Sequence, residues 1–104
     1  MKKIIITTLT ALSMAVGAFG TDHIVDQKNK TFIPHELTVK VGDTITFLNS
    51  DPFAHNAYTD DEANEFDIGM QASGTKKTVT IKAPSEFSVE CAIHPNMLLE
   101  VTAE

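Results

Sequence analysis

The amino-acid sequence predicts an all-β protein, a β-sandwich of short strands, and three observations predict it. After residue 20, apolar residues alternate with polar residues in several short runs. No run repeats at the helical period, and turn-forming residues separate the runs at short intervals. Alternation with a period of two is typical of half-buried strands, and many short strands at such spacing indicate two packed sheets.

The expected strands follow one another along the chain. Apolar–polar alternation predicts strands at residues 23–26, 37–41, 44–47, 75–82, 87–91 and 98–102. Gly42-Asp43 predicts a tight hairpin between the second and third of these strands. In the fifth strand, alternation places Phe87, Val89 and Cys91 on one inward face. Residues 60–73 have the least regular pattern and predict either a short helix or an irregular loop.

The N-terminal segment has the pattern of a cleaved secretory signal peptide. Basic residues follow Met1, an apolar run covers residues 4–16, and Ala18-Phe19-Gly20 places small residues at positions −3 and −1. This pattern predicts cleavage after Gly20, with Ala18 as a close alternative. The apolar run is shorter than the ~20 residues that a membrane span needs. We therefore expect a signal peptide at residues 1–20 and one exported domain at residues 21–104, in the periplasm.

Charge and cysteine content narrow the classes of function. The chain has 8 lysines and no arginine against 14 acids, a net charge of −6. Removing Lys2 and Lys3 leaves 6 lysines against 14 acids, or −8. This balance argues against nucleic acid and anionic membranes as partners and favours a basic protein. Cys91 is the only cysteine, and a lone thiol is unusual in an exported protein unless it is buried and inert, pairs between molecules, or binds a metal.

One segment near the C-terminus carries three metal-binding side chains. Cys91, His94 and Met97 lie at three-residue intervals, and His55 supplies a second imidazole from an earlier loop. Two histidines, a cysteine and a weak axial methionine are the ligands of blue-copper electron-transfer sites. Zinc fits less well because a thioether is a poor zinc ligand. A copper enzyme also fits less well, since four protein ligands leave no position for a substrate.

Residues around these ligands have expected roles of their own. We expect the side chain of Asn56 to join the two ligand loops, and the backbone N–H groups of Asn56 and Ile93 to reach the Cys91 sulfur. Met70 is a weaker alternative to Met97 and is expected to pack. Four residues predict an apolar docking patch around His94, namely Pro52, Phe53, Pro95 and Leu98.

The remaining histidines and an acidic cluster lie outside the ligand pattern. His35 follows Pro34 and is expected to be a solvated turn residue. His23, next to the predicted new terminus at Thr21, is either an ordinary surface residue or a weak second copper site with the terminal amine. An acidic cluster is either a solvated loop or a docking surface for a basic partner, and its members are Asp60, Asp61, Glu62 and Glu65.

The chain resembles the type I copper proteins, or cupredoxins, of the amicyanin, pseudoazurin and plastocyanin group. Two further stretches carry the resemblance in addition to Cys91-x-x-His94-x-x-Met97. The first is Phe32-x-Pro34, then Leu37-x-Val39-x-x-Gly42-Asp43-Thr44-Ile45-x-Phe47-x-Asn49-x-Asp51, then His55-Asn56. The second is Phe66-Asp67-Ile68-Gly69, which resembles a segment of methylamine-utilisation-type cupredoxins. The resemblance covers almost all of residues 22–103. One departure is Ile93, where amicyanin has proline.

The resemblance implies both a fold and a function. It implies a Greek-key β-sandwich that binds one copper ion through His55, Cys91, His94 and Met97, with His94 as the electron port. A soluble monomer of this kind carries single electrons between redox proteins, such as a dehydrogenase, a c-type cytochrome or a reductase, and is not an enzyme. The alternative is a periplasmic copper chaperone or buffer, which methionine-rich or histidine-rich tracts would favour; the sequence has none.

Overall fold

The computed structural model describes residues 20–104, so the predicted signal peptide lies outside the described residues except for its last residue, Gly20. Nine strands form in this part of the chain: β1 (Asp22–Lys28), β2 (Thr31–Ile33), β3 (Glu36–Val39), β4 (Thr44–Asn49), β5 (Tyr58–Thr59), β6 (Phe66–Asp67), β7 (Lys76–Thr80), β8 (Ser85–Glu90) and β9 (Leu98–Ala103). No helix forms between residues 20 and 104, and so no helix there is long and apolar enough to cross a membrane.

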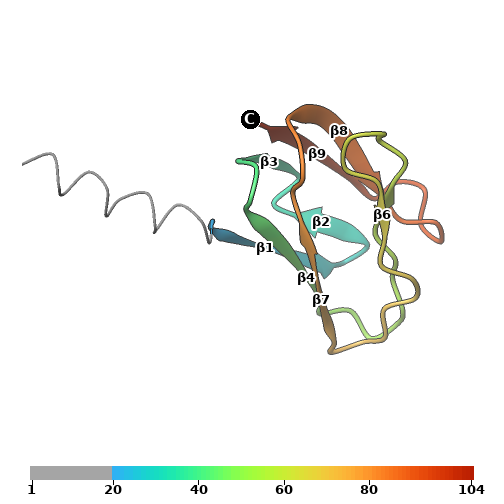
Figure 1. The fold of residues 1–104 in the computed structure, drawn as a ribbon. Helices are drawn as coiled ribbons and strands as arrows, with labels where there is room; N and C mark the ends of the chain where they lie inside the picture. The colour runs from blue at the N-terminus through green and yellow to red at the C-terminus, as the bar shows by residue number, and fades with distance from the viewer. Residues whose placement is uncertain (1–19) are drawn as a thin grey trace, which may run out of the picture.

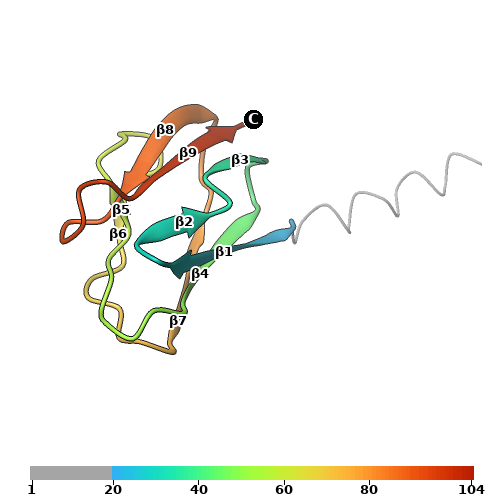
Figure 2. The same ribbon diagram turned by 180° about the vertical axis from the view of Figure 1, so that it is seen from behind.

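The strands form two layers, as Figures 1 and 2 show from opposite sides. One sheet has the order β2-β1-β4-β7, and the other has the order β3-β9-β8-β5-β6. The pairs β1–β4 and β3–β9 are parallel, whereas the remaining pairs are antiparallel. This arrangement confirms the predicted all-β sandwich.

Apolar side chains from both sheets fill the space between the layers. Four phenylalanine rings cross it in sequence, with centroid separations of 6.1 Å from Phe32 to Phe47, 6.0 Å from Phe47 to Phe66 and 6.5 Å from Phe66 to Phe87. These edge and tilted contacts are the favourable ones for aromatic pairs. Phe87 and Val89 point into this core, as the alternation in β8 predicts, and Cys91 follows them into it directly after the strand ends.

The predicted hairpin at Gly42-Asp43 is wrong. A turn does form, because the Asp43 N–H donates to the Lys40 carbonyl at 2.9 Å and Gly42 has a φ of 96°. However, β3 pairs with β9 and β4 pairs with β1 and β7, so this turn carries the chain from one sheet to the other. Turn residues indicate that the chain changes direction locally, but they do not indicate which strands pair afterwards.

The other strand predictions hold, with shifted ends. β3 ends at Val39, and Val41, expected in the strand, is 45% exposed. Residues 60–73 contain no helix; they form turns and the two-residue strand β6. The strands β2, β5 and β6 were not expected, since two or three residues are too few for alternation to be recognised.

Candidate metal centre

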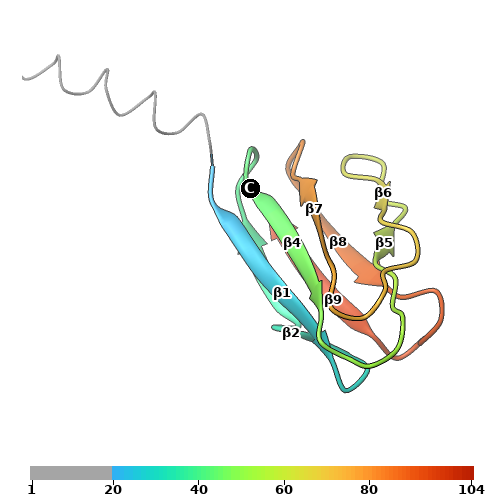
Figure 3. The same cartoon turned by 90° about the horizontal axis from the view of Figure 1, so that it is seen from below.

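Two loops at one end of the sandwich bring the predicted ligands together. The first loop, residues 50–57, follows β4, and the second, residues 91–97, connects β8 to β9. Figure 3 shows both loops at the same end of the molecule. Each loop leaves a strand in the interior of its sheet, so the sandwich itself fixes the starting point of each loop.

Three of the predicted ligands form a tight cluster. One ligand atom from each of His55, Cys91 and His94 lies within 4.8 Å of the others. The two Nδ1 atoms of His55 and His94 are 3.2 Å apart, and Cys91 Sγ is 3.8 Å from His94 Nδ1. Two nitrogen donors about 2.0 Å from one ion at a tetrahedral angle lie about 3.3 Å apart. The donor set therefore has the spacing that a single shared metal ion requires.

Met97 lies at the end of the same loop. Its side chain is fully buried, and its N–H donates to the His94 carbonyl at 3.0 Å, which closes the loop into a turn. Met97 is thus held one turn beyond His94, with its side chain in the interior of the domain. Its role as the fourth ligand stays a prediction. Met70 is 64% exposed, and the expectation that it packs is wrong.

Asn56 joins the two ligand loops, as predicted. Its Oδ1 accepts from the Ala92 N–H at 3.0 Å, while its Nδ2 donates to Asp67 Oδ1 at 2.9 Å and to the Gly69 carbonyl at 3.1 Å. Asn56 is almost completely buried, so these bonds have little competition from water. The expected N–H bonds to the Cys91 sulfur from Asn56 and Ile93 stay predictions.

The comparisons with known proteins agree with this geometry. The sequence profile described as "Copper binding proteins, plastocyanin/azurin family" matches residues 21–104. The chain belongs to the plastocyanin/azurin family of copper-binding proteins. The predicted family is therefore confirmed. Copper is confirmed as its cofactor, and the cluster of His55, Cys91 and His94 fits a single type I copper ion.

Two curated relatives illustrate the similarity. The chloroplast plastocyanin of Chlamydomonas reinhardtii is 29% identical over 94 residues, which cover 81% of this chain and 65% of that protein. Methylamine utilization protein MauL of Methylorubrum extorquens is 34% identical over 65 residues, which cover 62% of this chain and 57% of MauL. The chain thus spans less than two thirds of the length of each.

Solved structures match the fold of this cupredoxin. A variant of amicyanin in its reduced Cu(I) form has a TM-score of 0.73 at 26% identity, covering 80% of this chain and 82% of amicyanin. A copper-containing nitrite reductase from Thermus scotoductus has a TM-score of 0.74 at 26% identity, but this chain covers only 22% of it. The purple cupredoxin of Nitrosopumilus maritimus, at 20% identity and a TM-score of 0.69, supports the fold alone.

Several contacts fix His55 in this cupredoxin. Two backbone hydrogen bonds join His55 to Gln71. The His55 N–H donates to the Gln71 carbonyl at 3.0 Å, and the Gln71 N–H donates to the His55 carbonyl at 2.7 Å. The side chain of Asn49 donates to the Phe53 and Gln71 carbonyls, both at 2.9 Å. The His55 ring points its Nδ1 at the cluster, while its Nε2 donates to Asp51 Oδ2 at 2.6 Å.

Asp51 is a buried carboxylate with three donors. Besides His55, the N–H groups of Asn29 and Lys30 donate to it at 2.7 and 3.0 Å. Burial alone would raise the pKa of Asp51, but these three hydrogen bonds outweigh burial and hold the pKa below its ordinary value. Asp51 is therefore an anion directly behind His55, a predicted ligand. Sequence analysis missed this role, although Asp51 lies only four residues before His55 in the motif that the resemblance uses.

His94 is the only member of the cluster that reaches the surface. Burial lowers its pKa, and the charges of His55 and Lys30 lower it further, which favours the neutral imidazole that binds metals. Phe53 packs its ring against both histidines, 5.3 Å from the centroid of His55 and 5.6 Å from that of His94. All four residues of the predicted apolar patch are exposed, and Ile93, next but one to Cys91, is 44% exposed; that they form one patch around His94 stays a prediction.

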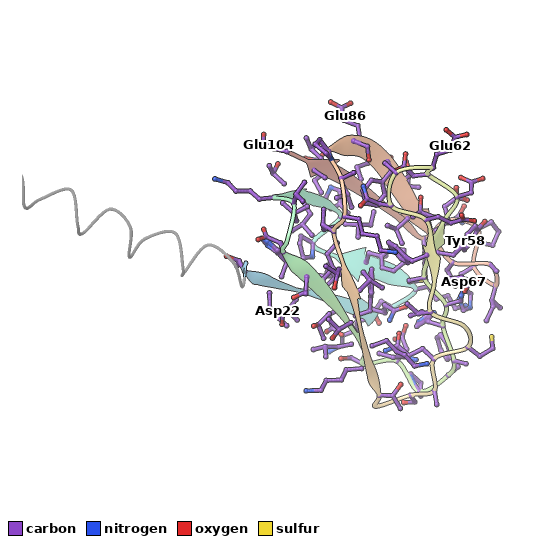
Figure 4. All side chains as sticks on the ribbon, in the orientation of Figure 1. Asp22, Tyr58, Glu62, Asp67, Glu86 and Glu104 are labelled. Carbon is purple, nitrogen blue, oxygen red and sulfur yellow. The ribbon has the colours of Figure 1, made fainter. Side chains whose placement is uncertain are left out.

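The remaining polar residues lie away from the cluster. His35 is exposed in the bend between β2 and β3, as predicted. His23 Nε2 lies 2.8 Å from Asp43 Oδ2, and so its side chain already has a partner. Asp61 accepts from the Asn64 N–H in its own loop and from the Ser85 hydroxyl at the start of β8, whereas Glu62 projects away from the body of the molecule (Figure 4). Asp61 therefore has a structural role, and the docking role of the acidic cluster stays a prediction.

Proposed function

We propose that this cupredoxin is an exported one-electron carrier with a mononuclear type I copper site. The observation that carries the proposal is the convergence of His55, Cys91 and His94 within 4.8 Å, on two loops fixed by the sandwich. Met97 is proposed as the weak axial ligand. Copper held by these residues would supply the redox chemistry: it would take up one electron from a donor as Cu(II) and pass it to an acceptor as Cu(I).

The chain's own residues set the conditions for this exchange. Cys91, His55 and Met97 are buried, so the donor atoms keep nearly the same positions in both oxidation states and water is kept away from them. The half-exposed His94 is the proposed port for electrons, since its ring is the one ligand that a partner is able to approach.

The proposed partners are redox proteins such as a dehydrogenase, a c-type cytochrome or a reductase. Exposed apolar side chains lie on the two ligand loops and directly after the second one, including Phe53, Ile93 and Leu98 at 39%, 44% and 45% exposure. A small apolar surface suits a transient complex, since electron-transfer encounters bury little area. The net charge favours a basic partner through faster encounter. The proposed location is the periplasm, reached by the predicted signal peptide at residues 1–20.

The visible spectrum of the mature protein with one equivalent of Cu(II) tests the proposal. We expect an intense blue or green thiolate-to-copper band that bleaches with ascorbate and returns on reoxidation. Cys91→Ser removes the sulfur, so the band should be absent from this variant. A colourless wild-type protein whose copper is readily removed by chelator would contradict the carrier and favour a copper chaperone or buffer.

A further inference from the structure

Two carboxylates flank β4 with nearly the same set of contacts. Asp43, just before β4, accepts from the N–H groups of Thr21 and Lys40 and bonds to His23 Nε2 at 2.8 Å. Asp51, just after β4, accepts from two N–H groups and from His55 Nε2 at 2.6 Å. Both residues are buried. The six-residue strand between them spans about 20 Å, so only one of the two carboxylates lies at the candidate metal centre.

The contacts of Asp51 leave its carboxylate no freedom to rotate. Asn29 and Lys30 have φ values of 55° and 58°, a left-handed turn that aims two successive N–H groups at the carboxylate. Asn29 donates to Oδ1, and Lys30 donates to Oδ2, the oxygen that also receives His55. The turn between β1 and β2 thereby fixes the orientation of the His55 ring, and with it the direction of Nδ1.

A fixed carboxylate behind a ligand imidazole has an electronic effect as well. When a ligating histidine donates its other N–H to a carboxylate, the basicity of the ligand nitrogen rises. A buried negative charge is poorly screened and interacts more strongly with Cu(II) than with Cu(I), because Cu(II) carries one more positive charge. Both effects stabilise the oxidised form of the site.

We propose that Asp51 is a positioning residue that orients His55 and lowers the reduction potential of the copper site. This inference rests on the proposed function, because it assigns a role toward the copper that His55 would bind. It concerns a residue that holds a ligand in place and does not itself touch the metal.

The test compares the wild-type protein, Asp51→Asn and the matched control Asp43→Asn. Each is loaded with copper, and its midpoint potential is determined by redox titration followed at the thiolate band. Both variants replace one buried carboxylate that has the same type of donors, so both should lose stability. Only Asp51→Asn should favour Cu(I), by at least tenfold in the equilibrium constant, which for a one-electron couple is about 59 mV. An equal potential in the two variants would overturn the proposal.

A second measurement needs no variant. In the Cu(I) form of the wild-type protein, proton NMR should show a slowly exchanging Nε2–H of His55, held by Asp51 and shielded from water. If Asp51→Asn does not fold, this proton decides the question, and its absence overturns the role of Asp51. A wild-type protein without a reversible thiolate band would instead overturn the proposed function, and the role of Asp51 with it.

Discussion

Three of the four proposed ligands are also core residues. His55 and Met97 are fully buried and Cys91 is 3% exposed, so three of the four proposed donors lie in the interior of the domain and only His94 reaches its surface. Close packing allows these side chains little movement. This explains how a small domain presents donors at the spacing of one ion: the packing that stabilises the sandwich also limits where the donor atoms lie.

Replacing Met97 separates ligation from packing. Met97→Leu conserves most of the volume, so the apoprotein should lose less than about 1.5 kcal/mol of stability. If the thioether is the fourth ligand, the variant should keep a thiolate band and have a higher midpoint potential, because loss of one electron-donating ligand destabilises the more highly charged Cu(II) more than Cu(I). The control is Leu99→Met at the next buried position, which should leave the potential unchanged. Equal potentials in both variants would exclude axial ligation by Met97.

Loops, rather than strands, hold the candidate centre, and two asparagines organise them. Asn56 joins the ligand loops through bonds to Ala92, Asp67 and Gly69. Asn64 likewise joins two loops, but away from the predicted ligands. Its side chain donates to the Ala83 carbonyl and accepts from the N–H groups of Lys82 and Ala83. Both side chains are buried, so removing either leaves backbone groups without partners.

These two asparagines form a matched pair for experiment. Asn56→Ala and Asn64→Ala should each destabilise the apoprotein by about 1–3 kcal/mol, the cost of leaving a buried polar group unpaired. Urea unfolding measures this loss. Only Asn56→Ala should also shift the thiolate band and accelerate the loss of copper to a chelator. If Asn64→Ala changes the band equally, the ligand loops respond to overall stability rather than to the Asn56 bridge.

The sequence predicted the positions of the strands better than it predicted which strands pair. Alternation identified the longer strands, because half-buried strands repeat with a period of two whatever they pair with. It did not show that β3 and β4 belong to different sheets, because pairing depends on residues distant in the chain. Likewise, ligand types and spacing indicated His55, Cys91 and His94. The role of Asp51 depends on a turn more than twenty residues earlier, and local patterns contain no trace of that contact.

At the scale of the whole molecule, the hydrophobic core is small, so we expect a bound metal to add measurably to the stability of the fold. A ligand that binds only the folded state adds about 2.7 kcal/mol at 100 times its dissociation constant. For a domain of this size that corresponds to an increase in melting temperature of about 10–20 °C. Calorimetry of the protein with and without one equivalent of Cu(I) should show such an increase, and a chelator should reverse it. Cys91→Ser should show a much smaller change.

Acid stability tests how the two sheets are connected at the end of the molecule that holds Asp43. Hydrogen bonds from His23, Lys40 and Thr21 lower the pKa of Asp43 from 3.8 to about 2. Because the folded-state pKa lies below the unfolded value, the stabilisation is complete above about pH 4 and is lost as the pH falls toward 2. Asp43→Asn should therefore have a flatter stability profile between pH 4 and 2 than the wild-type protein, although Asp22 and Asp51, whose pKa values are also lowered, leave some slope in the variant.

Urea unfolding of both apoproteins at several pH values measures this difference without interference from copper. The two profiles should converge as the pH falls to about 2 and below, where Asp43 becomes protonated in the folded as well as in the unfolded wild-type protein. Parallel profiles over the whole range would mean that the Asp43 contacts do not depend on its charge. The link from the start of β1 to the turn between β3 and β4 would then rest on packing alone.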